Sequence, residues 1–266
     1  MTTTETYRLS AVRYATRDAK RSDHFLGGDP DPEQPMPMDY FVWVATNAQR
    51  TIVIDTGFSA STAAKRGRIH LRQPAAGLRL LGVDASQVED VIITHLHYDH
   101  VGTIGDFPRA RLHLQEKDLH FVTGQAMTEA VRRASYEVDD VLNVVRALHT
   151  DRVRLYDGPA EVAPGLSLHL LGGHTPGMQA VRVHTARGWV VVASDATHYY
   201  ENMESRRPFA TTYDPAQVLA GFTTLRELAD SPRHIIPGHD PLVMRRYAPP
   251  SPELDGIAVR LDVPPT

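Results

Sequence analysis

Short apolar runs separated by polar turns recur along the chain and predict a protein built largely of β-strands. Each run either alternates between apolar and polar positions or is continuously apolar, and both patterns are typical of strands when the run is short. Residues 47–49, between two of the runs, suit a hairpin turn. The predicted strands are 7–14, 40–46, 51–54, 88–94, 111–114, 152–156, 166–171, 180–185, 189–193 and 234–236.

Helical patterns occur in three segments between these strands. Helices are predicted at 115–123 and 126–148, and the second has apolar residues every three or four positions. A third helix is predicted to begin at Asp214 and Pro215, because aspartate is a favoured N-cap and proline fits the first turn. Its apolar face is formed by Leu219, Phe222, Leu225 and Leu228.

The organisation of the chain indicates a single domain over residues 1–266. No short repeat, low-complexity linker or shift of composition marks a boundary, so we expect packed layers of strands and helices. A proline- and glycine-rich loop is predicted at 27–38, and the proline-rich tail 248–266 is expected to wrap the surface. Two buried-type strands, 51–56 and 190–196, both end in an aspartate, which hints at two similar halves.

The composition is that of a globular protein and excludes several classes of function. The chain has 266 residues, 42% hydrophobic and 23% charged, which suffices for a large core. A net charge of −4 without a long basic run argues against nucleic-acid and membrane-surface partners. No apolar run approaches the ~20 residues of a membrane span. Residues 1–6 show no secretion signal, so a cytoplasmic protein is expected.

The strongest chemical signal is the motif His95-x-His97-x-Asp99-His100 at the end of an apolar strand. The chain has 14 histidines and 0 cysteines, so it can bind a metal only through nitrogen and oxygen. His95 and His97 point the same way while the chain is extended, and Asp99 and His100 can face a second point. Four such side chains exceed what one tetrahedral metal takes from a single loop. The motif therefore predicts two neighbouring metal ions.

Three further candidate ligands stand at the ends of other apolar runs, because one loop cannot complete two coordination shells. His174 lies in the turn Gly-Gly-His-Thr-Pro-Gly. Asp195 follows Trp-Val-Val-Val-Ala-Ser, and His239 lies in Pro-Gly-His-Asp directly after Ile-Ile. Each of these residues taken alone could be a plain turn residue. Their combination with the first motif favours a shared metal site.

This combination resembles the metallo-β-lactamase superfamily over residues 51–240. The resemblance implies an α/β fold, a four-layer αβ/βα sandwich with its site at one edge of two sheets. It also implies that Asp55, at a strand end, supports the site from behind the ligands. The ligand set that it implies is His95, His97 and His174 on one metal, Asp99, His100 and His239 on the other, and Asp195 bridging the two.

Within the superfamily, the chain resembles the branch of N-acyl homoserine lactonases and 4-pyridoxolactonases. The stretch 194–202 and the later Arg207-Pro-Phe carry this likeness. These lactonases often have a tyrosine three positions after the bridging aspartate, where it contacts the substrate carbonyl. Here that position is His198, and Tyr199 and Tyr200 follow it. The three residues remain alternatives for the carbonyl-side role.

The resemblance implies a hydrolase that opens a lactone ring, with quorum quenching as the associated function. A hydroxide bridging the two ions would attack the carbonyl carbon, and Asp99 would carry the proton to the leaving alkoxide. Zinc is the favoured ion, although iron, manganese and cobalt accept the same ligands. The expected partner is a small lactone, and a homodimer is common in this branch.

Alternative functions remain open at this point. Glyoxalase II-like thioester cleavage and phosphoester hydrolysis use a similar metal pair, and a metal-free binding module is a third reading. Arg206 and Arg207 are either a solvated charge pair or a clamp for a substrate carboxylate. His24 could reach the site from the N-terminal segment. The sequence does not reveal which lactone or other ester would bind.

Overall fold

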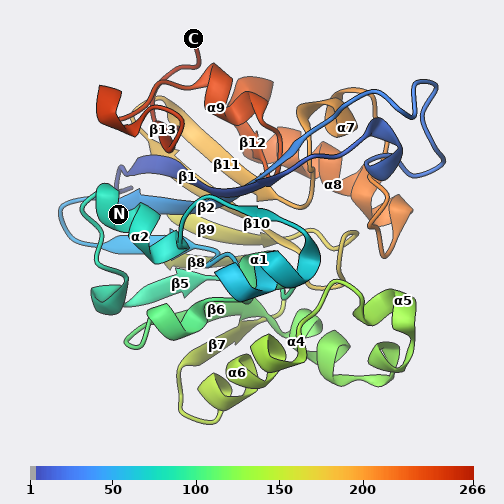
Figure 1. Cartoon of the computed structure of the whole chain (residues 1–266). Coiled ribbons are helices and arrows are strands. Elements are labelled where there is room, and N and C mark those ends of the chain that lie inside the picture. The colour runs from blue at the N-terminus through green and yellow to red at the C-terminus, as the bar shows by residue number, and fades with distance from the viewer. Residues whose placement is uncertain (1–3) are drawn as a thin grey trace.

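Two β-sheets lie face to face at the centre of the molecule, and helices cover their outer faces (Figure 1). This computed structural model describes residues 4–266. Residues 1–3, which belong to the predicted domain and to the segment expected to lack a secretion signal, lie outside the described residues. The layers follow the order helices, sheet, sheet, helices that the resemblance implied.

The first sheet combines an antiparallel part with a parallel part. Its strands are β1 (Arg8–Arg17), β2 (Met38–Thr46), β3 (Thr51–Ile54), β4 (Ile69–His70), β5 (Asp90–Ile92), β6 (Arg111–Gln115), β7 (Val153–Tyr156) and β13 (Ala258–Arg260). Their order is β13-β1-β2-β3-β5-β6-β7, with β4 also paired to β1. Asn47 closes the predicted hairpin between β2 and β3, because its side-chain oxygen accepts hydrogen bonds from the backbone N–H groups of Gln49 and Arg50.

The second sheet is largely antiparallel. Its strands are β8 (Ala160–Ala163), β9 (Leu166–Leu170), β10 (Gln179–Thr185), β11 (Gly188–Ser194) and β12 (Ile235–Pro237). They follow the order β12-β11-β10-β9-β8, and β12 runs parallel to β11. The predicted strands of both sheets are confirmed within a few residues at each end, whereas the short β4, β8 and β13 were not predicted.

The helices pack on the outer faces and connect the strands. They are α1 (Ala60–Arg66), α2 (Pro74–Leu80), α3 (Tyr98–Val101), α4 (Glu116–Thr123), α5 (Ala130–Arg133), α6 (Val138–Leu148), α7 (Tyr200–Glu204), α8 (Pro215–Leu228) and α9 (Leu242–Arg246). Helix α8 begins as predicted, because the Asp214 carboxylate accepts hydrogen bonds from the backbone N–H groups of Ala216 and Gln217.

Alternation along the strands separates three apolar layers. In β2, Trp43 packs between the two sheets and Val42 packs under the helices of the first sheet. In β11, Val192 likewise packs between the sheets, and Val191 packs against α8. Successive side chains of a strand point to opposite faces, so both faces of each sheet are buried. This arrangement produces the four layers.

The parallel strand pairs bring four strand ends to one edge of the molecule. Strand β5 runs parallel to β3, and β12 runs parallel to β11, so each pair ends at the same level. The polar residues that follow these strands are therefore placed in neighbouring loops. Loops beyond the carboxyl ends of parallel strands are a common place for a functional site.

The prediction of one continuous helix over 126–148 is wrong. A short 3-10 turn at 125–128 is followed by α5 and then, after a break, by α6. Contacts with a distant part of the chain explain the break, since Glu137 binds Lys65 at 2.5 Å and Arg66 at 2.7 Å. Tertiary contacts override the local helical periodicity here.

The proline-rich tail also contributes to a sheet. Residues 258–260 form β13, which pairs antiparallel with β1 at the edge of the first sheet. Val259 and Leu261 are buried between the two sheets. The tail is therefore part of the core and does not only wrap the surface as expected.

No helix within residues 4–266 combines the length and the apolar character that crossing a membrane requires.

Replacement of Phe222 by alanine tests the outer layer of the second sheet. The Phe222 side chain is 0% exposed in the apolar cluster between α8 and the sheet. We expect Phe222→Ala to lower the free energy of unfolding by about 3–5 kcal/mol, because it removes apolar contacts and leaves a cavity. Urea denaturation followed by circular dichroism measures this change. Thr223→Ala, at the neighbouring exposed position, is the control and should shift stability by less than about 0.5 kcal/mol.

Candidate metal centre

The loop after β5 presents its side chains in two directions. His95 and His97 lie in extended backbone before α3, and His97 is the residue that precedes the helix. Their rings are 4.6 Å apart between centroids. Asp99 and His100 lie inside the first turn of α3 and so face a different point. The change from strand to helix within six residues thus splits the motif into two halves, as predicted.

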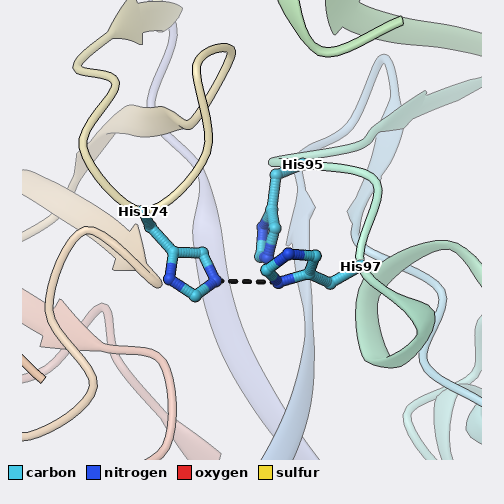
Figure 2. A group of neighbouring side chains, drawn as sticks. All are labelled: His95, His97 and His174. Atoms are coloured by element: carbon cyan, nitrogen blue, oxygen red, sulfur yellow. Dashed lines mark hydrogen bonds between the residues drawn. The ribbon is translucent and has the colours of Figure 1, made fainter. Parts of the chain in front are cut away.

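The turn that carries His174 approaches the first half from the second sheet. Gly172 and Gly173 have φ angles of 69° and 86°, and a Cβ on Gly173 would lie 2.7 Å from the backbone nitrogen of Val218. Glycine is therefore required at this turn. His174 donates from Nδ1 to the carbonyl oxygen of Thr211 at 2.7 Å. Its Nε2 lies 2.9 Å from Nδ1 of His97, and Figure 2 shows the two rings facing each other below His95.

Asp195 and His239 follow the parallel strands β11 and β12. His239 donates from Nδ1 to the carbonyl oxygen of Asp39 at 2.8 Å, which leaves Nε2 free to face the carboxylates. This Nε2 lies 3.0 Å from Oδ1 of Asp195 and 3.7 Å from Oδ2 of Asp99. A Cβ on Gly238 would lie 2.5 Å from Oδ1 of Asp195, so only glycine permits this approach.

Asp55 fixes the loop of the main motif from behind. It has a φ of 58° directly after β3, and its carboxylate accepts hydrogen bonds from the N–H of Thr94 at 2.7 Å and the hydroxyl of Thr94 at 2.8 Å. His100 donates from Nδ1 to Oδ2 of Asp55 at 2.8 Å. This carboxylate therefore orients the His100 ring so that Nε2 faces the cluster, which is the role that the resemblance implied.

The donor atoms of this cluster fit a metal centre. The Nε2 atoms of His95 and His100 and the Oδ1 atom of Asp195 are buried without a hydrogen-bond partner within residues 4–266. A buried polar atom without a partner is costly, and a cation that accepts its lone pair removes this cost. Ligand-type atoms lie within 4.8 Å of one another in the groups His95–His97–His174, His95–His100–Asp195, Asp99–His100–His239 and His174–Asp195–His198.

The structure thus brings together all seven predicted ligands, and the first and third groups are the sets predicted for the two metals. His198 joins the cluster as a further ligand-type side chain.

Electrostatics keep several of these imidazoles in the form that binds metals. Burial lowers the pKa of His95 and His97 well below the usual range, and the neighbouring histidines add to the shift. Burial also raises the pKa of the Asp195 carboxyl, but His239, His198 and His100 outweigh it and hold that pKa well below its usual range. Neutral imidazole and ionised carboxylate are the states that a metal requires.

Asp118 links the two loops that carry the first set of candidate ligands, and no sequence motif pointed to this role. It lies in α4 and is 1% exposed. Oδ2 accepts a hydrogen bond from the N–H of Leu96 at 2.7 Å, and Oδ1 accepts one from the N–H of Gly177 at 3.1 Å. Burial raises the pKa of the Asp118 carboxyl, although these hydrogen bonds oppose the shift. Asp118 therefore sets the spacing between His97 and His174.

The three candidates for the carbonyl-side role occupy different places. The His198 ring stacks on Phe209 at 3.6 Å, and its Nε2 lies 2.9 Å from Oδ2 of Asp195. The Tyr199 hydroxyl lies 3.1 Å from Nε2 of His24 and donates to the carbonyl oxygen of Pro37. The Tyr200 ring is buried between the sheets. Of the three, only His198 lines the cavity over the cluster.

A cavity of about 120 Å³ opens above the donor cluster. Asp99, Asp195, His239 and His24 contribute to its wall, so His24 reaches the site from the N-terminal segment. A second cavity of about 440 Å³ lies beside it and shares His97 and His174 with it. Its remaining lining is mixed: Phe121, Tyr136 and Tyr213 are aromatic, whereas Glu129 and Arg132 are charged.

Arg206 and Arg207, for which a solvated pair and a carboxylate clamp were the alternatives, line neither cavity. Arg207 binds Asp29 at 3.0 Å and stacks on Phe25 at 3.9 Å, and Arg206 is exposed. The cations that line the smaller cavity are Arg17, Arg66 and Arg68. Arg17 is the last residue of β1, Arg66 is the last residue of α1, and Arg68 lies just after it. No sequence motif in these segments pointed to the three arginines.

Comparison with known families agrees with this geometry. A model of the metallo-beta-lactamase superfamily matches residues 37–239. The chain belongs to this superfamily. The match includes all seven predicted ligands, and the four-layer fold predicted from the resemblance is confirmed.

The relatives of this superfamily member include lactonases. An N-acyl homoserine lactonase of Bacillus thuringiensis is 29% identical over 165 residues, which are 61% of this chain and 60% of that protein. This chain therefore spans less than two thirds of the length of that relative. A quorum-quenching N-acyl homoserine lactone lactonase has a TM-score of 0.76 at 22% identity, over 90% of this chain and 95% of that one.

A further lactonase structure carries a bound product. This N-acyl homoserine lactone hydrolase, with N-hexanoyl-L-homoserine at its catalytic metal centre, has a TM-score of 0.75 at 22% identity. The alignment covers 91% of this chain and 96% of that one. At this level of identity the likeness shows a common fold.

Removal of a ligand tests the metal centre directly. We expect His97→Ala and Asp195→Ala to lower metal affinity by more than about a hundredfold, because the loss of a residue that only supports a ligand already costs about ten- to a hundredfold. Metal content after dialysis is measured by mass spectrometry, and turnover should fall with it. The control is His120→Ala, an exposed histidine on α4. Full turnover by a metal-free variant would refute the centre.

Asp118→Asn tests the link between the two loops. An amide can accept only one of the two backbone hydrogen bonds, so one N–H group loses its partner. We expect stability to fall by about 1–3 kcal/mol and metal affinity by about tenfold or more. Competition with a chelator measures the affinity. Glu116→Gln, in the first turn of the same helix, is the control. Equal affinity in both variants would contradict this role.

Proposed function

We propose that this protein is a lactonase, a metal-dependent hydrolase that opens a lactone ring with two divalent ions, of which zinc is the favoured choice. The observation that carries the proposal is the convergence of seven predicted ligands at the base of a cavity. The lactonase of Bacillus thuringiensis supports the choice of substrate class. The lactonase with N-hexanoyl-L-homoserine at its metal centre supports it as well.

The two halves of the cluster would each hold one ion. The first ion would lie among His95, His97 and His174, and the second among Asp99, His100 and His239, with Asp195 between them. When bound, such a pair lowers the pKa of water so that it can act as a nucleophile near neutral pH, and it polarises the ester carbonyl.

The residues around the cluster orient the substrate and move the proton. Asp99 lies at the cavity wall, and its backbone oxygen accepts a hydrogen bond from the Tyr14 hydroxyl at 2.9 Å, which holds it in place. Its carboxylate is placed to carry a proton to the alkoxide that leaves when the ring opens. His198, held flat against Phe209, faces the same cavity and takes the carbonyl-side role in this proposal.

The larger cavity offers room for the group attached to the lactone. Phe121, Tyr136 and Tyr213 give it an aromatic wall beside His97 and His174. An acyl chain or ring that leaves the metal centre would bury apolar surface there. The homodimer, the cytoplasmic location and the absence of nucleic-acid and membrane partners stay predictions.

A panel of substrates tests the proposal. It contains N-hexanoyl homoserine lactone, an acyl thioester and a phosphotriester, each assayed by acid or product release with and without a chelator. We expect ring opening of the lactone to have a kcat/KM at least about a hundredfold above the others, since the site discriminates in the transition state. Chelation should abolish activity, and added zinc should restore it. A faster reaction with the thioester or the phosphotriester would assign the protein to that class instead.

A further inference from the structure

The wall of the smaller cavity carries arginines that form no ion pair with a carboxylate among the described residues. Three guanidinium groups line it, from Arg17, Arg66 and Arg68. Arg66 is fully engaged, because it binds Glu137 at 2.7 Å and donates to the carbonyl oxygens of Ala134 and Tyr136. Arg17 and Arg68, in contrast, have no carboxylate partner among the described residues.

Arg17 has no counter-ion in the described part of the chain. It is the last residue of β1, and its side chain is partly buried at the cavity wall. Within residues 4–266 its side chain forms no hydrogen bond or ion pair, and its Nε is buried without a partner. A partly buried cation without a partner is unfavourable, so this arrangement suits a ligand that brings negative charge.

Arg68 is held in position but is also not neutralised. Its Nε donates to the Tyr98 hydroxyl at 3.1 Å, and Nη1 donates to the backbone oxygen of Arg66 at 2.7 Å. These bonds leave Nη2 without a partner among residues 4–266, and no carboxylate there lies within ion-pair distance of the group. The guanidinium is therefore fixed before any ligand binds, which reduces the entropy lost on binding.

The carboxylates that line this cavity form no ion pair with Arg17 or Arg68. Asp99 and Asp195 belong to the metal cluster, whose divalent cations would more than neutralise them together with Asp55. Asp23 is exposed at the rim and accepts a hydrogen bond from the backbone N–H of Lys20. With the two proposed divalent ions bound, the cavity as a whole would have a surplus of positive charge.

We infer that Arg17 and Arg68 bind a carboxylate of the substrate beside the metal centre, so that the preferred substrate is a lactone that carries a negative charge. This inference rests on the proposed lactonase function. The planar guanidinium group can bind a carboxylate through two parallel hydrogen bonds, which a neutral amide cannot reproduce. The neighbouring cavity, with the aromatic side chains of Phe121, Tyr136 and Tyr213, would hold the uncharged remainder of the molecule.

A pair of matched small lactones tests the inference by kinetics. The probes are γ-butyrolactone-γ-carboxylate and the corresponding carboxamide, assayed with the metal-loaded enzyme. We expect kcat/KM to favour the carboxylate by about a hundredfold, because each charged hydrogen-bonded contact contributes about tenfold. Arg17→Gln and Arg68→Gln should each reduce this preference about tenfold. Arg206→Gln, an exposed arginine outside both cavities, is the matched control and should leave the preference unchanged.

Calorimetry provides a readout that does not depend on turnover. Glutarate and glutaramide are titrated into the protein as purified and into the same variants. Glutarate should bind at least about tenfold more weakly to Arg17→Gln and Arg68→Gln than to the wild type, and the difference should shrink at high salt. Circular dichroism confirms that each variant is folded. If a variant does not fold, the preference of the wild type between the two lactones decides the matter.

The outcomes separate this inference from the proposed function. Hydrolysis of both lactones at equal rates by the wild type would overturn the carboxylate site and leave the lactonase standing. Absence of hydrolysis together with arginine-dependent glutarate binding would refute the lactonase and support the anion site. Equal glutarate binding by wild type and both arginine variants would overturn the carboxylate site whatever the rates are.

Discussion

The Asp195 carboxylate is the group on which the rest of the site depends. Three histidines from separate segments direct Nε2 toward its oxygens, His198 at 2.9 Å, His239 at 3.0 Å and His174 at 3.3 Å. The group is almost fully buried, and an isolated charge in such a place is unfavourable unless hydrogen-bond donors or a cation face it. The loops at the edge of both sheets therefore converge on one point, and Gly238 is needed to let the chain pass beside it.

The two similar strands that suggested two halves of the chain, 51–56 and 190–196, both lead to the candidate metal centre. Asp55 directly follows strand β3, and Asp195 directly follows strand β11. At both points the backbone passes through a left-handed residue, Asp55 with φ 58° and Ser194 with φ 45°. The two aspartates have different tasks, because Asp55 orients His100 and Asp195 faces the cluster itself. Similar strand ends thus supply one residue that supports the candidate ligands and one that is itself a candidate ligand.

The cluster of candidate ligands could be predicted because each member follows an apolar strand, where a histidine or aspartate close to a glycine stands out. Asp118 could not be recognised in the same way, since an aspartate in the first turn of a helix is common for reasons of helix stability alone. Arg17 and Arg68 were missed because only the folded chain brings the end of β1 next to the end of α1. The prediction of one helix over 126–148 was wrong because Glu137 forms ion pairs with Lys65 and Arg66, which are distant in the sequence.

The interruption between α5 and α6 has a consequence for how the two cavities can vary. Ser135 lies in it and borders both cavities, and its backbone oxygen accepts a hydrogen bond from the N–H of Tyr98 beside the ligand loop. Tyr136, next to it, packs edge-on against the ring of His97 at 4.7 Å. The segment 134–137 thus lies beside both cavities, and none of its side chains is a candidate metal ligand. Substitutions along it can therefore change the shape of both cavities without altering any of the seven candidate ligands.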